Sequence, residues 1–416
     1  MFASYRRIFA APGTVAFTLA GLLGRLAFSM AGVSMLVMIA TRRESYALAG
    51  AVSATGVVVT ALGMPLLGRL VDRHGQSRVT VPSLLAAAVP CAALPLCARY
   101  GAPVWTLFVC CAASSVLPNL GGMARARWAY LYRDDPAARQ LANSFEQALD
   151  ELCFMAGPVL AMLLCTSLFP EAGMLVSVAL SGAGGLAFAA QRRTEPPVQP
   201  PVRLPGGGVL RARGLRVLVP AFLATGAVFG SMEVTTVAYA DSLGQRPLAG
   251  GVLALMAAGS CLSGLAFGLV RPSRSPAARL VAGVAAMAGL LLLPPAAALS
   301  GAGLGVLAPA ILLAGSGTAP TMVAGLTLVQ EMLPARQLNE GMAVVIAGLM
   351  IGISAGSALG GAVAQHAAPG TGYWLPAGAA ALALLITLAG FRHLRTPGAP
   401  GTAGPGNPVE AVAATR

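Results

Sequence analysis

Twelve long apolar segments recur along the chain, and short polar or arginine-bearing segments separate them. A helix of about 20 mostly apolar residues spans the hydrocarbon core of a bilayer. The sequence therefore predicts an all-α integral membrane protein with twelve transmembrane helices. The predicted spans are residues 14–37, 46–67, 79–98, 103–124, 142–166, 172–190, 215–240, 248–270, 278–300, 303–326, 340–364 and 372–391.

A segment rich in proline and glycine, residues 191–213, divides these spans into two groups of six. Its composition is typical of an extended, solvated cytoplasmic linker. We therefore predict one six-helix bundle over residues 1–190 and a second over residues 214–395. The tail, residues 396–416, is rich in Pro, Gly and Ala and is predicted to be disordered and cytoplasmic.

The two groups of spans resemble each other at a nearly constant offset. The stretch Pro136–Leu141 recurs in shortened form as Pro334–Leu338, and Gly68 at the end of the second span matches Gly268 at the end of the eighth. Several matches in the same order indicate a duplication, so the bundles are predicted to be pseudo-symmetric. Parallel six-helix repeats of this kind are typical of transporters.

The composition narrows the class of protein further. Only 10% of the 416 residues are charged, whereas a soluble globular protein has about 25%, which argues against a soluble enzyme, a disordered scaffold or a disulfide-rich domain. The seven cysteines lie in or beside apolar runs and are interpreted as small core residues. The net charge of +13 does not indicate nucleic-acid binding, since no zinc-ligand spacing or aromatic-interleaved basic face accompanies it.

The placement of the basic residues, all of them arginine, predicts the orientation in the membrane. With the N-terminus in the cytoplasm, 22 of the 27 arginines fall in cytoplasmic segments, Arg125 and Arg127 among them, and four fall outside. This bias follows the positive-inside rule, so both termini are predicted to be cytoplasmic and the chain to lie in the cell membrane. The first span is expected to be retained, because its apolar run extends well beyond the length of a signal peptide.

The loop between the second and third spans carries a motif, which reads Gly68-Arg69-Leu70-Val71-Asp72-Arg73-His74-Gly75-Gln76-Ser77-Arg78. It resembles the loop signature of the major facilitator superfamily, and among its members the bacterial drug and sugar efflux-like group, although Gln76 replaces a basic residue. The resemblance implies a latch that holds the two halves together in the outward-facing state, formed by Gly68, Asp72, Arg73, Gly75 and Arg78. Asp72 is expected to pair with Arg73 or to accept from the N-terminus of the following helix, and a solvated turn is the alternative.

Five charged residues stand out in the predicted spans, where charge is costly and usually functional: Arg25 in the first span, Glu146, Asp150 and Glu151 in the fifth, and Glu233 in the seventh. Glu146 and Asp150 share a helix face, and the helical rise places Arg25 at a similar depth. We predict that Arg25 pairs with Asp150 or Glu151 and that a carboxylate of this cluster carries the coupling proton. The alternatives are a static ion network, or a Glu146 that already lies in cytoplasmic water.

Three residues are candidate substrate contacts, because helices 4, 7 and 10 line the central cavity in the superfamily that the motif resembles. Glu233 stands alone in the seventh span. Asn119 follows Pro118 in the fourth span and Thr321 follows Pro320 in the tenth, where proline frees backbone carbonyls. The alternatives are a Glu233 hydrogen-bonded to a neighbouring helix and two helix kinks that are filled by packing.

Two further features receive structural interpretations. A stripe of glycines at intervals of four runs along the eleventh span and is interpreted as a surface on which the two halves slide during transport. Trp128 and Trp374 are interpreted as anchors at the membrane interface. The stripe consists of Gly348, Gly352, Gly356 and Gly360.

The sequence as a whole predicts secondary transport by alternating access, and we favour proton-coupled export of a small amphipathic molecule such as a drug, sugar or secondary metabolite. Gly157-Pro158 partly resembles a pattern of proton-driven exporters, with a simple kink as the alternative. No phosphate-binding loop is present, so an ion gradient must supply the energy. The expected partners are the substrate, protons and the bilayer; no cofactor, metal or nucleic acid is expected, and the protein is expected to be a monomer. Uptake by symport, a non-transporting sensor and, less favoured, a membrane enzyme are the alternatives.

Overall fold

The computed structural model describes residues 2–198, 209–245, 248–270, 275–301, 303–366, 368 and 370–394. The predicted tail and residues 199–208 of the predicted linker lie outside these ranges. The described chain forms helices and no strand, and their bounds are α1 Phe2–Ile8, α2 Thr14–Arg43, α3 Tyr46–His74, α4 Gln76–Arg99, α5 Val104–Ser114, α6 Leu120–Leu131, α7 Pro136–Ser167, α8 Ala172–Ala190, η1 Arg192–Thr194, η2 Val209–Arg211, α9 Leu215–Ser242, α10 Ala249–Leu269, α11 Pro276–Leu290, α12 Leu293–Leu299, α13 Leu304–Gly315, α14 Thr318–Met332, η4 Ala335–Gln337, α15 Leu338–His366, η5 Thr371–Tyr373, α16 Trp374–Ala389 and α17 Phe391–Leu394.

The predicted all-α membrane class is confirmed, with a correction to the fourth span. Within the described residues, 11 helical stretches are long and apolar enough to cross a membrane, and α5 adds a shorter apolar helix. The span predicted at 103–124 is broken, because α5 ends at Ser114 and α6 begins only at Leu120. The ninth and tenth spans are each built from two consecutive helices, α11 with α12 and α13 with α14.

Side-chain caps explain where several helices begin. Asp135 accepts a hydrogen bond from the Ala138 amide (2.9 Å) and precedes Pro136, which suits the first turn because its missing N–H would have no partner there. Asn119 accepts from the Gly122 amide at 3.0 Å. An Asn side chain of this kind favours a new helix start, so it fixes the break between α5 and α6.

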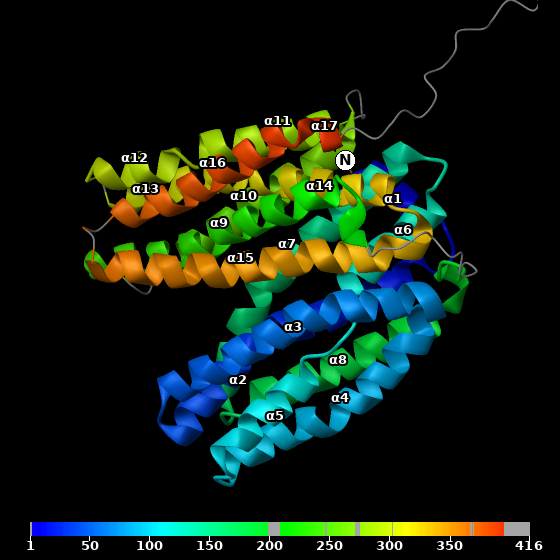
Figure 1. The fold of residues 1–416 in the computed structure, drawn as a ribbon. Helices are drawn as coiled ribbons and strands as arrows, with labels where there is room; N and C mark the ends of the chain where they lie inside the picture. The colour runs from blue at the N-terminus through cyan, green and yellow to red at the C-terminus, as the bar shows by residue number, and fades with distance from the viewer. Residues whose placement is uncertain are drawn as a thin grey trace, which may run out of the picture.

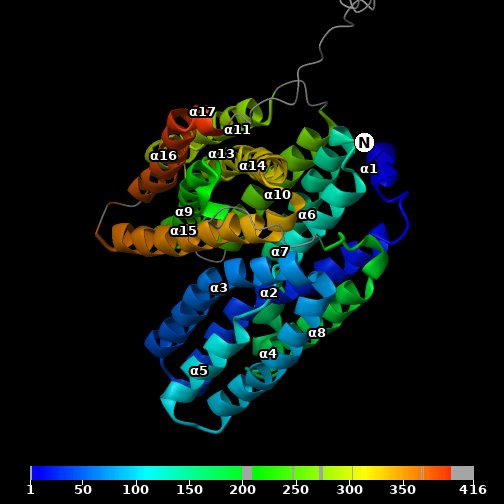
Figure 2. The ribbon, with the colours of Figure 1, turned by 45° about the vertical axis from the view of Figure 1, so that its right-hand side comes forward.

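The helices form two sets, α2–α8 and α9–α17, which can be followed from blue to green and from green to red in Figure 1. The sets meet where α3 and α10 end and where α7 and α15 begin. They diverge toward the opposite end in both views (Figures 1 and 2). We call these the closed end and the open end of the molecule.

The glycine stripe of α15 does not lie between the two sets, which corrects its interpretation as a sliding surface. A Cβ atom added at Gly348 would lie 3.1 Å from the Val219 carbonyl oxygen, and one at Gly352 or Gly356 would collide with the backbone of Leu223 or Ala227. These contacts are all on α9, in the same set as α15. The glycines therefore fix close backbone packing within one bundle.

Candidate functional site

A cluster of four charged side chains ties α2, α6 and α7 together inside the first bundle. Arg25 contacts Glu146 at 2.7 Å and Asp150 at 3.0 Å. Arg125 contacts the other oxygen of Asp150 at 2.6 Å. Trp128 donates its indole N–H to Glu146 at 2.6 Å. Two carboxylates thus face two guanidinium groups, and their charges balance.

Two members of this cluster correct the sequence analysis. Arg125 and Arg127, which the charge bias places in a cytoplasmic segment, are almost fully buried on α6. Arg127 donates to Gln76 at 2.8 Å, so neither arginine lies in a solvated loop. Trp128 is fully buried and is not an interface anchor, whereas Trp374 is exposed. Glu146 is fully buried as well, so it does not lie in cytoplasmic water.

Glu151 lies apart from the arginine cluster, and its pairing with Arg25, one of two predicted options, is not present. Its carboxylate accepts hydrogen bonds from Gln147 at 3.2 Å and from Ser260 at 2.8 Å. Ser260 in turn accepts from Thr318 at 2.8 Å. Glu151 makes no ion pair within the described ranges. It therefore connects α7 of one bundle to α10 and α14 of the other through uncharged groups.

A first latch joins the end of α3 to the start of α15. The Asp72 carboxylate accepts from the Asn339 amide (3.1 Å), from the Asn339 side chain (2.7 Å) and from the Glu340 amide (2.8 Å). Arg69 pairs with Glu340 at 2.7 Å. The first amides of a helix have no intrahelical acceptor, so Asp72 caps α15 across the two bundles. This partner differs from both partners expected for Asp72.

The close approach at the first latch requires a glycine. A Cβ atom at Gly68 would lie 2.7 Å from the Asn339 carbonyl oxygen and 2.8 Å from the Glu340 Cα. Gly75 has a φ of 96°, which favours glycine. Arg73 and Arg78 are exposed, and neither side chain makes a hydrogen bond or ion pair with another described residue. The structure thus brings only part of the predicted latch into contact with the second bundle.

A second latch joins the start of α7 to the end of α10. Gln140 donates to the carbonyl oxygens of Phe267 (2.8 Å) and Val270 (3.0 Å) and accepts from Arg279. Arg139 lies 3.5 Å from Glu331 on α14. Asn143 also crosses between the bundles and donates to Thr327 and Gln330.

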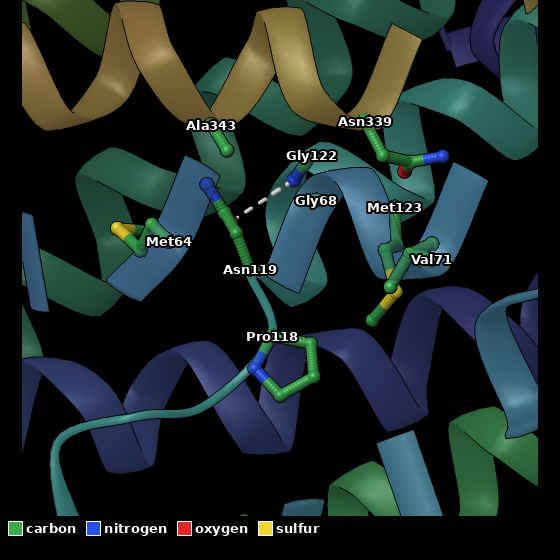
Figure 3. A pocket seen from close by; sticks show the side chains of 9 residues that line it. All are labelled: Met64, Gly68, Val71, Pro118, Asn119, Gly122, Met123, Asn339 and Ala343. Carbon is green, nitrogen blue, oxygen red and sulfur yellow. Dashed lines mark hydrogen bonds between the residues drawn. The ribbon is translucent and has the colours of Figure 1, made fainter. Parts of the chain in front are cut away.

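Asn119 lies at the junction of the two bundles, not in a substrate-sized cavity. With Gly68 and Asn339 it lines a cavity of about 10 Å³, which holds about one water molecule. Figure 3 shows its side chain turned toward Gly122, with the α15 residues Asn339 and Ala343 above it. This geometry corrects its assignment as a substrate contact in the present conformation.

The other two candidate substrate contacts differ in access. Thr321 is almost fully buried, donates to the Gly317 carbonyl of its own helix at 2.9 Å and packs against Gly283 of α11. It is therefore not accessible to a ligand, which corrects that assignment. Glu233 is exposed on α9, and its carboxylate makes no hydrogen bond or ion pair within the described part of the chain.

Comparison with protein families decides the classification. The sequence model described as the Major Facilitator Superfamily matches residues 17–314. The chain belongs to the Major Facilitator Superfamily. No curated protein sequence matches the chain. Within the described ranges, no group of three or more His, Cys, Asp or Glu side chains is arranged to hold a metal ion.

Solved structures of other superfamily transporters share the fold at low sequence identity. A bacterial homologue of the iron transporter ferroportin, in an outward-facing state, aligns with a TM-score of 0.72 and 15% identity over 91% of this chain and 99% of that one. The human organic anion transporter MFSD10 aligns with a TM-score of 0.66 and 17% identity over 94% and 99%. The Escherichia coli fucose:proton symporter aligns with a TM-score of 0.66 and 13% identity over 90% and 99%.

Proposed function

We propose that this protein is a secondary active transporter that exports a small amphipathic molecule in exchange for protons. Membership of the superfamily supports transport. The arginine bias supports a cytoplasmic closed end, and the structure then corresponds to an outward-facing state. Alternating access would open the closed end, so every contact that crosses it must break during the cycle.

The position of Glu151 and its uncharged surroundings are the observation that supports proton coupling. Of Glu146, Asp150 and Glu151 on α7, Glu151 is the one whose carboxylate connects the two bundles, and its hydrogen-bond partners are neutral. An ionised carboxylate accepts hydrogen bonds about twice as strong as a neutral one does. Deprotonated Glu151 therefore stabilises the contact with Ser260, whereas a proton taken up from the outside weakens that contact and favours opening toward the cytoplasm.

The cluster of Arg25, Arg125, Glu146 and Asp150 is proposed to have a structural role. Asp150 and Glu146 each contact a guanidinium group, and removal of one partner would leave a buried charge without compensation. Such a loss destabilises a protein by about 3–5 kcal/mol. We therefore assign the Arg25 cluster to holding α2, α6 and α7 together, and Glu151 to carrying the proton.

Glu151→Gln tests the coupling directly. The substrate is first found by a growth screen of toxic compounds in an efflux-deficient host, and the purified protein is then reconstituted in liposomes. We expect Glu151→Gln to abolish transport driven by a pH gradient while substrate counterflow persists, because counterflow needs no net proton movement. Asp134→Asn changes a strongly exposed carboxylate and is the control. Proton-driven transport at the wild-type rate in Glu151→Gln would refute the assignment.

Glu233 is proposed as the contact for a positively charged group of the substrate. Its carboxylate is exposed on a spanning helix and has no partner among the described residues, so a cationic ligand could satisfy it. We expect Glu233→Gln to weaken substrate binding at least tenfold, since charge-assisted hydrogen bonds contribute about 1.5–3 kcal/mol. Unchanged binding by isothermal titration calorimetry would remove Glu233 from the site.

Uptake by symport is the second candidate, and the structural likeness to a fucose:proton symporter and to a proton:xylose symporter supports it. The direction of transport separates the two. In liposomes with an acidic interior, an exchanger accumulates substrate as protons leave, whereas a symporter carries substrate out along with them. A sensor would bind the substrate without moving it.

A further inference from the structure

A groove of about 720 Å³ lies on the side of the first latch, where α3, η2, α9 and α15 meet. One part of its lining is apolar and comes from Pro65, Leu66, Val219, Pro220 and Val344. The other part is charged and comes from Arg69, Arg211, Arg216 and Glu340. Three arginines against one glutamate give the charged part a net positive charge.

This groove is separate from the interior of the transporter. On α3 the groove residues Pro65, Leu66 and Arg69 lie on a different face from Met64 and Val71, which line the small cavity with Asn119. Helical periodicity places Val58, Leu62 and Leu66 on one stripe, and all three are more than half exposed. The apolar part of the groove therefore continues along the outer face of α3 for about 12 Å.

We propose that this groove binds an anionic phospholipid of the cytoplasmic leaflet. The phosphate would lie among Arg69, Arg211 and Arg216, and an acyl chain would follow the α3 stripe. Guanidinium groups match phosphate geometry, and the Arg69–Glu340 pair uses one of the five N–H donors of Arg69. The proposal rests on the cytoplasmic orientation of the closed end given under Proposed function.

The position of the groove gives the lipid a regulatory effect. Arg69 belongs to the first bundle and Arg216 to α9 of the second, whereas Arg211 ends η2, the short helix whose Val209 packs in the core of the second bundle. All three line the groove beside the first latch. A phosphate that contacts arginines from both bundles stabilises the closed end. Because the arginines separate when that end opens, anionic lipid shifts the protein toward the outward-facing state.

Binding is tested on the purified full chain in nanodiscs of phosphatidylcholine, with and without phosphatidylglycerol. Native mass spectrometry counts the retained phosphatidylglycerol, and no substrate or proton gradient is present, so the result does not depend on transport activity. We expect retention to fall roughly fivefold for each of Arg211→Gln and Arg216→Gln. The control is Arg213→Gln, because Arg213 is exposed in the same segment but does not line the groove. Equal retention in all variants, or an equal loss in the control, would overturn the proposal.

Two further arms separate a lipid from a free anion. Inorganic phosphate added to phosphatidylcholine nanodiscs is expected to leave the conformational equilibrium unchanged, whereas phosphatidylglycerol increases the closed-end population. Val344→Phe fills the apolar part of the groove without changing its charge and is expected to lower phosphatidylglycerol retention. If phosphate alone reproduces the effect, or if Val344→Phe retains the lipid normally, the site recognises an anion and not a phospholipid.

Discussion

The two latches at the closed end occupy equivalent places in the repeat but use different chemistry. At the first latch, the Asp72 carboxylate caps the N-terminus of α15 across the bundles. At the second, the Gln140 amide donates to the last carbonyl oxygens of α10. The first therefore depends on a carboxylate and a helix dipole. The second is centred on the neutral Gln140 amide, which also accepts a hydrogen bond from Arg279, beside one long ion pair, Arg139–Glu331.

The two glycines thus both allow the bundles to approach closely, while the polar groups around them differ. Gly68 and Gly268 both lie where one bundle touches the other. At Gly68 the neighbouring atoms belong to the backbone of α15, whereas at Gly268 they belong to the side chains of Tyr5 and Ser144. Backbone cannot move aside as a side chain can, so the first latch tolerates less change.

Gly68→Ala is expected to have the largest effect. Its added methyl group would overlap the backbone of α15, and such overpacking costs about 1–3 kcal/mol, which shifts a conformational equilibrium roughly 5- to 150-fold. Spin labels at Asp134 and Arg392, both exposed near the closed end, report the separation of the bundles by pulsed electron resonance in a cysteine-replaced background. We expect the distance between these labels to lengthen.

Gly268→Ala is the matched control for this change. The Tyr5 hydroxyl and the Ser144 Oγ can rotate away from the new methyl group, and only the Ser144 Cβ, 2.7 Å away, is fixed to its backbone. At Gly68 all the neighbouring atoms are backbone, so the closed-end population should fall less in Gly268→Ala than in Gly68→Ala. Equal shifts in the two variants would mean that the two contacts are mechanically equivalent and that the first latch is no less tolerant than the second.

Asp72→Asn is expected to have the next largest effect. The substitution preserves size but removes the charge that faces the helix N-terminus, a loss of about 1–2 kcal/mol. The closed-end population should fall roughly 5- to 30-fold, and added salt should reduce the difference from wild type, because salt screens charge. Arg73→Gln, at the exposed neighbouring position, should leave the label distances unchanged. A response of Arg73→Gln as large as that of Asp72→Asn would place Arg73 in the latch.

The sequence predicted the spans and the meeting of Arg25 with Asp150, because depth and helix face follow from the rise and period of a helix. It did not predict Arg125 in the same cluster, because the break after α5 changes where α6 lies. It also could not assign the partner of Asp72. Asn339 is 267 positions away, and only tertiary packing brings that helix start to α3.

Thr321 and the α15 glycines were assigned wrongly for the same reason, because the sequence does not identify the partner of a residue. The spacing of residues identifies a helix face, but it does not say which neighbour covers that face. Thr321 turns to α11, and the glycine stripe turns to α9, so both features serve packing within one bundle. Proline next to a polar residue was not a sufficient signal for a substrate contact.

Gln140→Ala is expected to have the smallest effect of the three on the closed end. It removes the two neutral hydrogen bonds to the carbonyl oxygens of Phe267 and Val270 and the hydrogen bond accepted from Arg279. Water replaces these bonds once the closed end opens, so the net loss is about 1 kcal/mol. The closed-end population should fall roughly fivefold, and the same spin-label distances report it. This variant should respond less to salt than Asp72→Asn does, since Gln140 carries no charge itself and only one of its three hydrogen bonds, the one from Arg279, involves a charged group.

The double variant Asp72→Asn with Gln140→Ala then tests whether the latches act on one equilibrium. The bundles are expected to move as rigid bodies, and the two latches share no residue, so their free-energy changes should add. A combined shift that equals the larger single shift would show that opening one latch already releases the other. In that case the charge at Asp72 alone would control the closed end, and the neutral latch would only follow it.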